Sequence, residues 1–135
     1  MIMQDILLSD RNADQELLAG QIVDSALKVH SALAPGMLES AYEQCLSCEL
    51  EGCGIDVTRQ VSVPIRYRDI QIDAAYRMDL LVGGIIAVEI KSVEALLPIH
   101  EAQILTYLKF SGLRLGFLLN FNVTLIKHGI RRFVR

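Results

Sequence analysis

The segment DLLVGGIIAVEIK at residues 79–91 places two apolar runs on either side of a Gly-Gly pair. Strand-like runs joined through glycines predict a β-hairpin. In the second run Glu89 and Lys91 are two residues apart, so their side chains lie on the same face of a strand. Because burying an unpaired charge is costly, charges within so apolar a run need a charged partner, a metal ion or an open cleft.

The length of the hairpin loop decides whether Asp79 and Glu89 share a face of the sheet. A two-residue turn over 83–84 sets Asp79 opposite Val88, and the two carboxylates then point to opposite faces. A three-residue loop over 83–85, with a glycine in the left-handed conformation, sets Asp79 opposite Glu89. We predict the three-residue loop, which holds the carboxylates about 5 Å apart at Cβ. At that distance they can share one hard cation through oxygen ligands.

Two carboxylates and an ammonium on one face suit the hydrolysis of a phosphodiester. Mg²⁺ or Mn²⁺ held by Asp79 and Glu89 would polarise the phosphate and acidify a bound water. Lys91 could orient that water or stabilise the transition state, because the pKa of a lysine is easily shifted by its surroundings. The same three residues also fit a structural ion-pair cluster without chemistry, and their spacing leaves both interpretations open.

A family resemblance starts from these residues. Asp79 followed by Glu89-Ile90-Lys91 resembles the D…(D/E)xK signature of the PD-(D/E)XK nuclease superfamily. Other blocks resemble, in order, those of the GxxExxY proteins of its RecB-like branch: residues 36–42, 77–82, 100–109 and 116–122. The resemblance covers roughly residues 15 to 134, and several blocks in sequence are more specific than one motif. It implies an α/β fold with a restriction-endonuclease-like core, in which α-helices flank a mixed central β-sheet.

The resemblance also implies roles for residues outside the hairpin. Glu39 would complete a metal site with Asp79 and Glu89, as an acidic residue on an early helix does in related nucleases. A carboxylate in the first turn of a helix is equally explained by the helix macrodipole. Tyr42 and Glu43 lie about one turn after Glu39 on the same helical face. Tyr42 is expected either beside the metal ligands or packed in the core.

Gln103 and Tyr107 resemble the QxxxY element that follows the metal motif in RecB-like nucleases. An amide and a phenol suit a DNA phosphate, or could steady Lys91. The alternative is an amphipathic helix whose polar groups merely cover the sheet.

Hydrophobic periodicity predicts the element order α-α-β-β-β-α-β-β in one domain, residues 1–135. The expected helices are 15–33, 38–50 and 99–111, and the expected strands are 55–67, 70–82, 85–91, 115–120 and 125–134. Pro64 in the first strand indicates a sheet edge or a bulge. His30 and His128 have no evident partner and are expected at the surface.

Composition bounds the location and chemistry of the chain. No apolar run approaches the roughly 20 residues that span a bilayer, and residues 1–5 do not begin a secretory signal. We therefore expect a cytoplasmic protein without membrane contact. The three cysteines, Cys45, Cys48 and Cys53, lack the fourth ligand that a zinc or iron–sulfur site normally takes, and are expected as buried, reduced thiols.

The formal net charge of −3 counts against tight binding of duplex DNA, which usually rests on a basic surface. A C-terminal basic cluster could hold phosphates or could simply be solvated: Lys127, His128, Arg131, Arg132 and Arg135. Two functions remain. The first is a Mg²⁺- or Mn²⁺-dependent nuclease acting on DNA rather than RNA. The second is an inactive nuclease-fold module that works through a protein partner or as a homo-oligomer. Because both acids and the lysine are present, we favour the nuclease.

Overall fold

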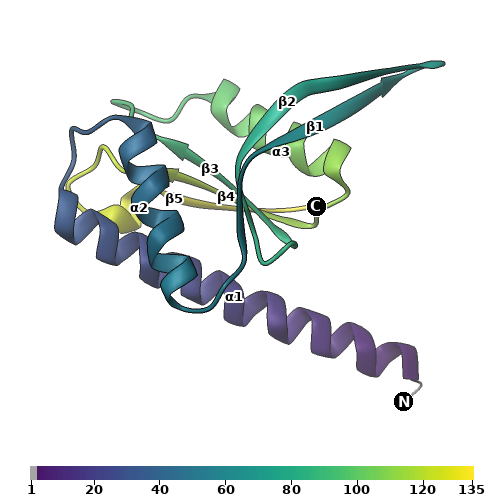
Figure 1. Cartoon of the computed structure of the whole chain (residues 1–135), viewed down its shortest axis with the longest axis horizontal. Helices are drawn as coiled ribbons and strands as arrows, with labels where there is room; N and C mark the ends of the chain where they lie inside the picture. Colours follow the sequence, from purple (N-terminus) through teal and green to yellow (C-terminus); the bar gives the residue numbers. More distant parts are fainter. Residues whose placement is uncertain (1–2) are drawn as a thin grey trace.

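A mixed five-stranded sheet with helices on both faces forms the fold (Figure 1). The computed structural model describes the backbone of residues 3–135 and the side chains of residues 12–135. The elements are α1 Met3–Leu33, α2 Glu39–Gly52, β1 Val57–Tyr67, β2 Ile70–Val82, β3 Ile86–Lys91, α3 Pro98–Ser111, β4 Leu115–Asn120, the short 3₁₀ helix η1 Ile126–His128 and β5 Ile130–Val134. The predicted order is confirmed, although α1 begins twelve residues before the predicted residue 15, and the last predicted strand is a 3₁₀ turn followed by β5.

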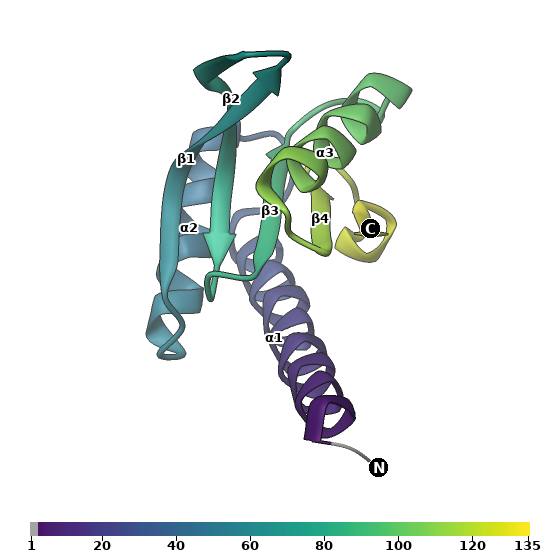
Figure 2. The ribbon, with the colours of Figure 1, turned by 90° about the vertical axis from the view of Figure 1, so that its right-hand side faces the viewer.

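The strands lie in the order β1-β2-β3-β4-β5. The β3–β4 pair is parallel and the other neighbouring strands are antiparallel. The parallel pair requires a crossover connection, which α3 provides by returning the chain to the end of the sheet at which β3 begins. α1 and α2 cover one face of the sheet and α3 covers the other (Figure 2). Ile22, Leu46 and Ile90 belong to the first core, and Ile104 and Leu108 to the second. β3 and β4, which lie between the two cores, are buried along nearly their whole length.

The hairpin between β2 and β3 has the predicted three-residue loop. Val82 pairs with Ile86, and the backbone N–H of Ile85 donates to the carbonyl of Val82 at 3.1 Å. Gly83 and Gly84 are both left-handed, with φ of 60° and 73°. Leu80 pairs with Val88, so the next position in this register sets Asp79 opposite Glu89. The register expected from the sequence is confirmed.

Beyond the sheet, β1 and β2 continue together as a long hairpin. Their register shifts between Val63 and Ile65, which confirms the bulge expected at Pro64 on this edge strand. Residues 66–75 are all exposed, and this part of the hairpin projects away from the body of the molecule (Figure 1). We call residues 64–75 the arm.

Two expectations from the sequence are wrong. His30 is buried, not at the surface, because its Nε2 bonds to the carbonyl oxygen of Val123 at 2.7 Å and its ring lies near Phe121. Cys48 and Cys53 are exposed and only Cys45 is partly buried, so the cysteines are not core residues. None of the described helices combines the length and apolar character that crossing a membrane requires.

The left-handed loop makes a prediction about stability. Gly84→Ala should lower the free energy of unfolding by about 1–2 kcal/mol, the cost of a left-handed conformation with a side chain, since open space surrounds the added methyl group. Gly20→Ala in α1 also meets open space, and should raise stability by up to about 1 kcal/mol through helix propensity. Urea denaturation of both variants measures the contrast. Equal effects at the two positions would contradict the assigned loop conformation.

Candidate active site

The two acids of the hairpin meet where β2 separates from β3. Regular pairing of these strands ends at Leu80 and Val88. One residue further, the backbone N–H of Ile90 donates to Oδ2 of Asp79 at 2.8 Å. A carboxylate therefore takes a hydrogen bond from a strand N–H where pairing with the neighbouring strand has stopped. Glu89 is only 3% exposed and Asp79 is half-buried, so Glu89 lies largely out of water and Asp79 partly so.

The burial of Glu89 perturbs its titration strongly. Burial and the neighbouring Asp79 carboxylate raise the pKa of Glu89 to about 9, against the smaller lowering effects of the Tyr107 hydroxyl and the Lys91 ammonium. At neutral pH and without a cation, Glu89 therefore holds a proton. A divalent cation binding between the two carboxylates would take the place of that proton. This donor set fits Mg²⁺ or Mn²⁺, which prefer carboxylate oxygens.

Tyr107 reaches the acids from α3. It is 7% exposed, and its ring packs edge-on against Tyr76 of β2 with centroids 5.3 Å apart. Burial and the charge of Glu89 raise the pKa of Tyr107 above its ordinary value. The phenol therefore stays protonated and remains a hydrogen-bond donor toward Glu89.

Lys91 and Gln103 both have unused hydrogen-bonding capacity. Lys91 ends β3 and is partly exposed. In the part of the chain whose side chains are described, salt bridges join three arginines to glutamates, and none includes Lys91. The Oε1 atom of Gln103 is buried without a hydrogen-bond partner, which costs about 1–3 kcal/mol for a neutral group. An ammonium or a bound water would satisfy that oxygen.

Glu39 lies beside the end of β3 but apart from the acid pair. It is exposed at the first position of α2, and its Oε1 accepts the backbone N–H of Ser92 at 3.3 Å. Ser92 in turn donates through its hydroxyl to the carbonyl of Met37 at 2.6 Å. Among the described residues, no group of three or more His, Cys, Asp or Glu side chains is close enough to hold a metal ion. The structure therefore brings Asp79 and Glu89 together without Glu39.

A second acid of α2, Glu43, is linked to Asp79. Glu43 is 5% exposed, and its Oε2 accepts from Nε and Nη2 of Arg59 at 3.2 and 2.8 Å. The amide of Gln60 donates to Oε1 of Glu43 at 2.6 Å and to Oδ1 of Asp79 at 3.3 Å. Gln60 has a left-handed φ of 54°, an uncommon conformation for a residue other than glycine. The only sequence signal for Glu43 is its position one turn after Glu39.

Tyr42 serves the core and the loop before α2. Its side chain is fully buried, and its ring stacks on Phe121 at 4.6 Å between centroids. Its hydroxyl donates to the carbonyl of Ala34 and accepts the backbone N–H of Met37 at 3.1 Å. Of the two roles expected for Tyr42, these contacts support packing.

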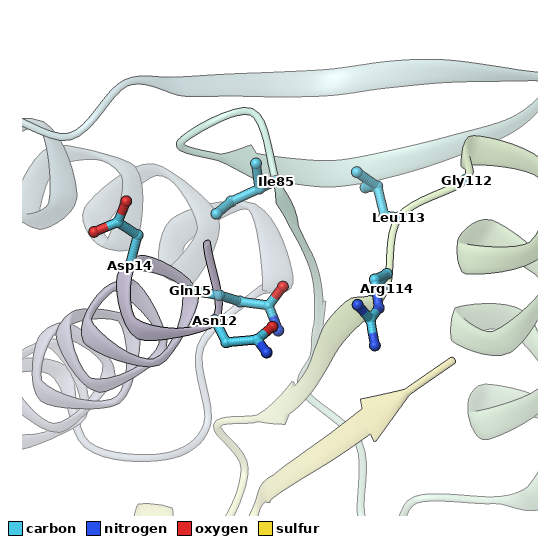
Figure 3. A pocket seen from close by; sticks show the side chains of 7 residues that line it. All are labelled: Asn12, Asp14, Gln15, Ile85, Gly112, Leu113 and Arg114. Carbon is cyan, nitrogen blue, oxygen red and sulfur yellow. The ribbon is translucent and has the colours of Figure 1, made fainter. Parts of the chain in front are cut away.

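A separate pocket lies at the other end of β3 (Figure 3). Ile85, just before β3, contributes to its wall, whereas the acid pair and Lys91 lie toward the end of that strand. The full lining is Asn12, Asp14, Gln15, Ile85, Gly112, Leu113 and Arg114. No residue of the acid site contributes to it, so this pocket and the acid site are distinct.

Comparison with known proteins gives one finding. The family model of the PD-(D/E)XK nuclease superfamily matches residues 16–133. Comparisons with curated proteins and with solved structures gave no match. The mixed five-stranded sheet with its flanking helices agrees with the fold of that superfamily.

The raised pKa of Glu89 predicts how stability depends on pH. The folded state keeps a proton up to about pH 9 that the unfolded chain releases near its ordinary pKa. In EDTA the free energy of unfolding should therefore fall as the pH rises from about 5 toward 9. Glu89→Gln, which stays neutral, should lose this part of the dependence, and Mn²⁺ should oppose the fall in the wild type. Urea denaturation across this range measures the difference, and parallel curves for wild type and variant would contradict it.

Proposed function

Because the chain belongs to the PD-(D/E)XK nuclease superfamily, we propose that it is a metal-dependent nuclease that hydrolyses phosphodiester bonds of DNA. The observation that carries this proposal is the pairing of half-buried Asp79 on β2 with buried Glu89 on β3, the strand that ends in Lys91. Burial and the nearby Asp79 raise the pKa of Glu89 to about 9, as expected for two neighbouring acids with no cation bound between them. We also assign the chain to the GxxExxY group of the RecB-like branch, on the motif at 36–42 and the Gln103 and Tyr107 pair.

The proposed metal ligands are Asp79 and Glu89, with Glu39 as the third. When bound, Mg²⁺ or Mn²⁺ would supply positive charge to the phosphate and lower the pKa of a bound water. The Ile90 N–H fixes Asp79 before any ligand arrives, so little ordering of that carboxylate remains to be done. Glu39 would have to leave the N–H of Ser92 to join the pair.

The other site residues act on the water and the phosphate. Lys91 carries an ammonium without a described salt bridge, and it would orient the attacking water or stabilise the charge of the transition state. The Tyr107 hydroxyl, which lowers the pKa of Glu89, would donate a hydrogen bond to that carboxylate. Gln103 has a buried oxygen in need of a donor, and it would position Lys91 or a water beside it. We also propose that the protein is cytoplasmic.

A second function has one observation in its favour. Much of the C-terminal basic cluster is already used within the chain: Arg131 pairs with Glu101, Arg132 with Glu16, and Arg135 donates to the carbonyl of Leu108. Its capacity for phosphates is correspondingly small. The alternative is therefore an inactive nuclease-fold module that acts through a protein partner or as a homo-oligomer.

Lys91→Ala separates chemistry from metal binding. The variant should lose cleavage of plasmid, linear and single-stranded DNA by at least about 100-fold, a typical contribution of a positioned acid–base group, and keep its affinity for Mn²⁺ within a few fold. Asp79→Asn/Glu89→Gln should lose both properties. Calorimetric titration with Mn²⁺ followed by cleavage assays on the same samples measures the two effects. Wild-type turnover in Lys91→Ala would remove this residue from the mechanism, and Mn²⁺ binding without cleavage by the wild type would favour the alternative function.

The two acids of α2 form a matched pair for testing the third ligand. Glu39→Gln should weaken Mn²⁺ binding with little loss of stability, because Glu39 is exposed. Glu43→Gln should instead lower the free energy of unfolding by about 1–3 kcal/mol, since it weakens the buried bonds to Arg59 and Gln60. Calorimetry and urea denaturation separate the two effects. A loss of Mn²⁺ affinity in Glu43→Gln alone would assign the third ligand to Glu43.

A further inference from the structure

Several exposed cations of this acidic chain form no salt bridge among the residues with described side chains, and the arm and α3 carry three of them. Arg59, Arg131 and Arg132 all form salt bridges with glutamates. Arg66 and Arg68 of the arm are exposed, and neither is in a salt bridge among the residues with described side chains. Lys109 of α3 is likewise exposed and without one. These cations are available to an external anion.

A groove between the arm and α3 brings two of these cations together. Its lining comprises Pro64, Ile65, Arg66, Gln71, Lys109 and Phe110. Arg66 and Gln71 are partners across the hairpin and so present their side chains to the same face. The ammonium of Lys109 lies 5.4 Å from the centroid of the Phe110 ring, a cation–π contact that favours this placement. The arm also carries two acids: Asp69 lies three residues after Arg66, and Asp73 accepts a hydrogen bond from Gln71 at 2.9 Å.

The groove and the candidate active site share the same helix and the same strand. Phe110 follows Tyr107 by one helical turn of α3, about 5 Å along the axis, and the Tyr107 hydroxyl is close enough to Glu89 to lower the pKa of that carboxyl. Gln71 and Asp79 both belong to β2. A polymer with repeated anionic groups could therefore span the groove and the acid pair at once. A small anion is too short to contact the groove and the acid pair together.

We propose that the arm and α3 bind the sugar–phosphate backbone of the nucleic acid, with Arg66 and Lys109 each contacting a phosphate near the scissile one. This proposal rests on the proposed function. The arm is a two-stranded ribbon that projects from the body (Figure 1), and the major groove of B-DNA, about 12 Å wide, admits such a ribbon. Phosphate contacts of this kind fix position without reading sequence, which fits a small domain without a separate recognition domain.

The test compares two variants that each lose two charges. Arg66→Gln/Lys109→Gln removes the groove cations. Lys28→Gln/Lys127→Gln removes two exposed cations, one on α1 and one on η1, and neither of them lines the groove. Binding of a labelled DNA duplex is measured by fluorescence anisotropy in EDTA over a series of salt concentrations. Hydrolysis of bis(4-nitrophenyl) phosphate with Mn²⁺ is measured in parallel, because this small diester needs the acid site alone. Thermal melting checks that both variants fold.

Loss of the groove cations should weaken duplex binding by at least about tenfold near 0.1 M salt and reduce the salt slope by about two, one for each phosphate contact. The control variant should stay within about twofold of wild type, and diester hydrolysis should not change in either. Equal weakening in both variants would overturn the groove, since overall charge would then explain it. Wild type that binds DNA through Arg66 and Lys109 but does not hydrolyse the small diester would support the groove and contradict the nuclease.

The opposite face of the arm offers a competing use. Tyr67 pairs with Ile70, so these two apolar side chains share the face opposite to Arg66 and Gln71, and both are exposed. Sedimentation of wild type and Tyr67→Ser/Ile70→Ser tests whether a second copy covers it. A dimer that the serine variant abolishes, together with unchanged DNA binding in Arg66→Gln/Lys109→Gln, would assign the arm to self-association and overturn the proposal.

Discussion

The hydrogen bond from the Ile90 N–H to the Asp79 carboxylate is the interaction on which the rest of the arrangement depends. In a continuous sheet that N–H would belong to a ladder of backbone bonds, and β2 would stay beside β3. With a side chain as acceptor, β2 is free to leave at Asp79 and continue with β1 into the arm. This contact fixes the Asp79 carboxylate where β2 leaves β3. Because β3 ends at Lys91, the part of β2 that belongs to the arm pairs with β1 alone.

Much of this geometry follows from the sequence because it depends on simple periodicities. Side chains alternate along a strand, so the loop length at Gly83 and Gly84 fixes whether Asp79 and Glu89 share a face. The predicted loop and register are those observed. The network around Glu43 could not be predicted in this way. It requires Gln60 in a left-handed conformation, which no local sequence rule assigns to a glutamine. The burial of His30 could not be predicted for a similar reason, because its hydrogen-bond partner is the carbonyl of Val123, which is distant in the chain.

The positions of the basic residues in the sequence do not show which of them are paired in the fold. The sequence directs attention to the C-terminal basic cluster, yet Arg131 and Arg132 pair with Glu101 and Glu16. Each of these partners is distant along the chain, so only the fold reveals that the charges are compensated. Arg66 and Lys109 are less conspicuous in the sequence, but they lack such partners in the described part of the chain and line a common groove. The proposal of a phosphate-binding groove therefore rests on which cations are unpaired and lie together, and the total charge gives no such information.

The pKa of Glu89 is shifted in the direction opposite to that expected for an acid neutralised by a structural ion pair. In a structural Asp/Glu/Lys cluster the cation would neutralise the acids and lower their pKa values. Here Lys91 has only a minor effect, and burial together with Asp79 raises the pKa of Glu89 to about 9. The folded chain therefore holds two acids side by side without a cation of its own sufficient to balance them. Such an arrangement favours binding of an external cation, since the cation would relieve both the desolvation and the repulsion. The desolvation and the repulsion between the two acids destabilise the metal-free fold at high pH. A metal ion bound between them would relieve both effects.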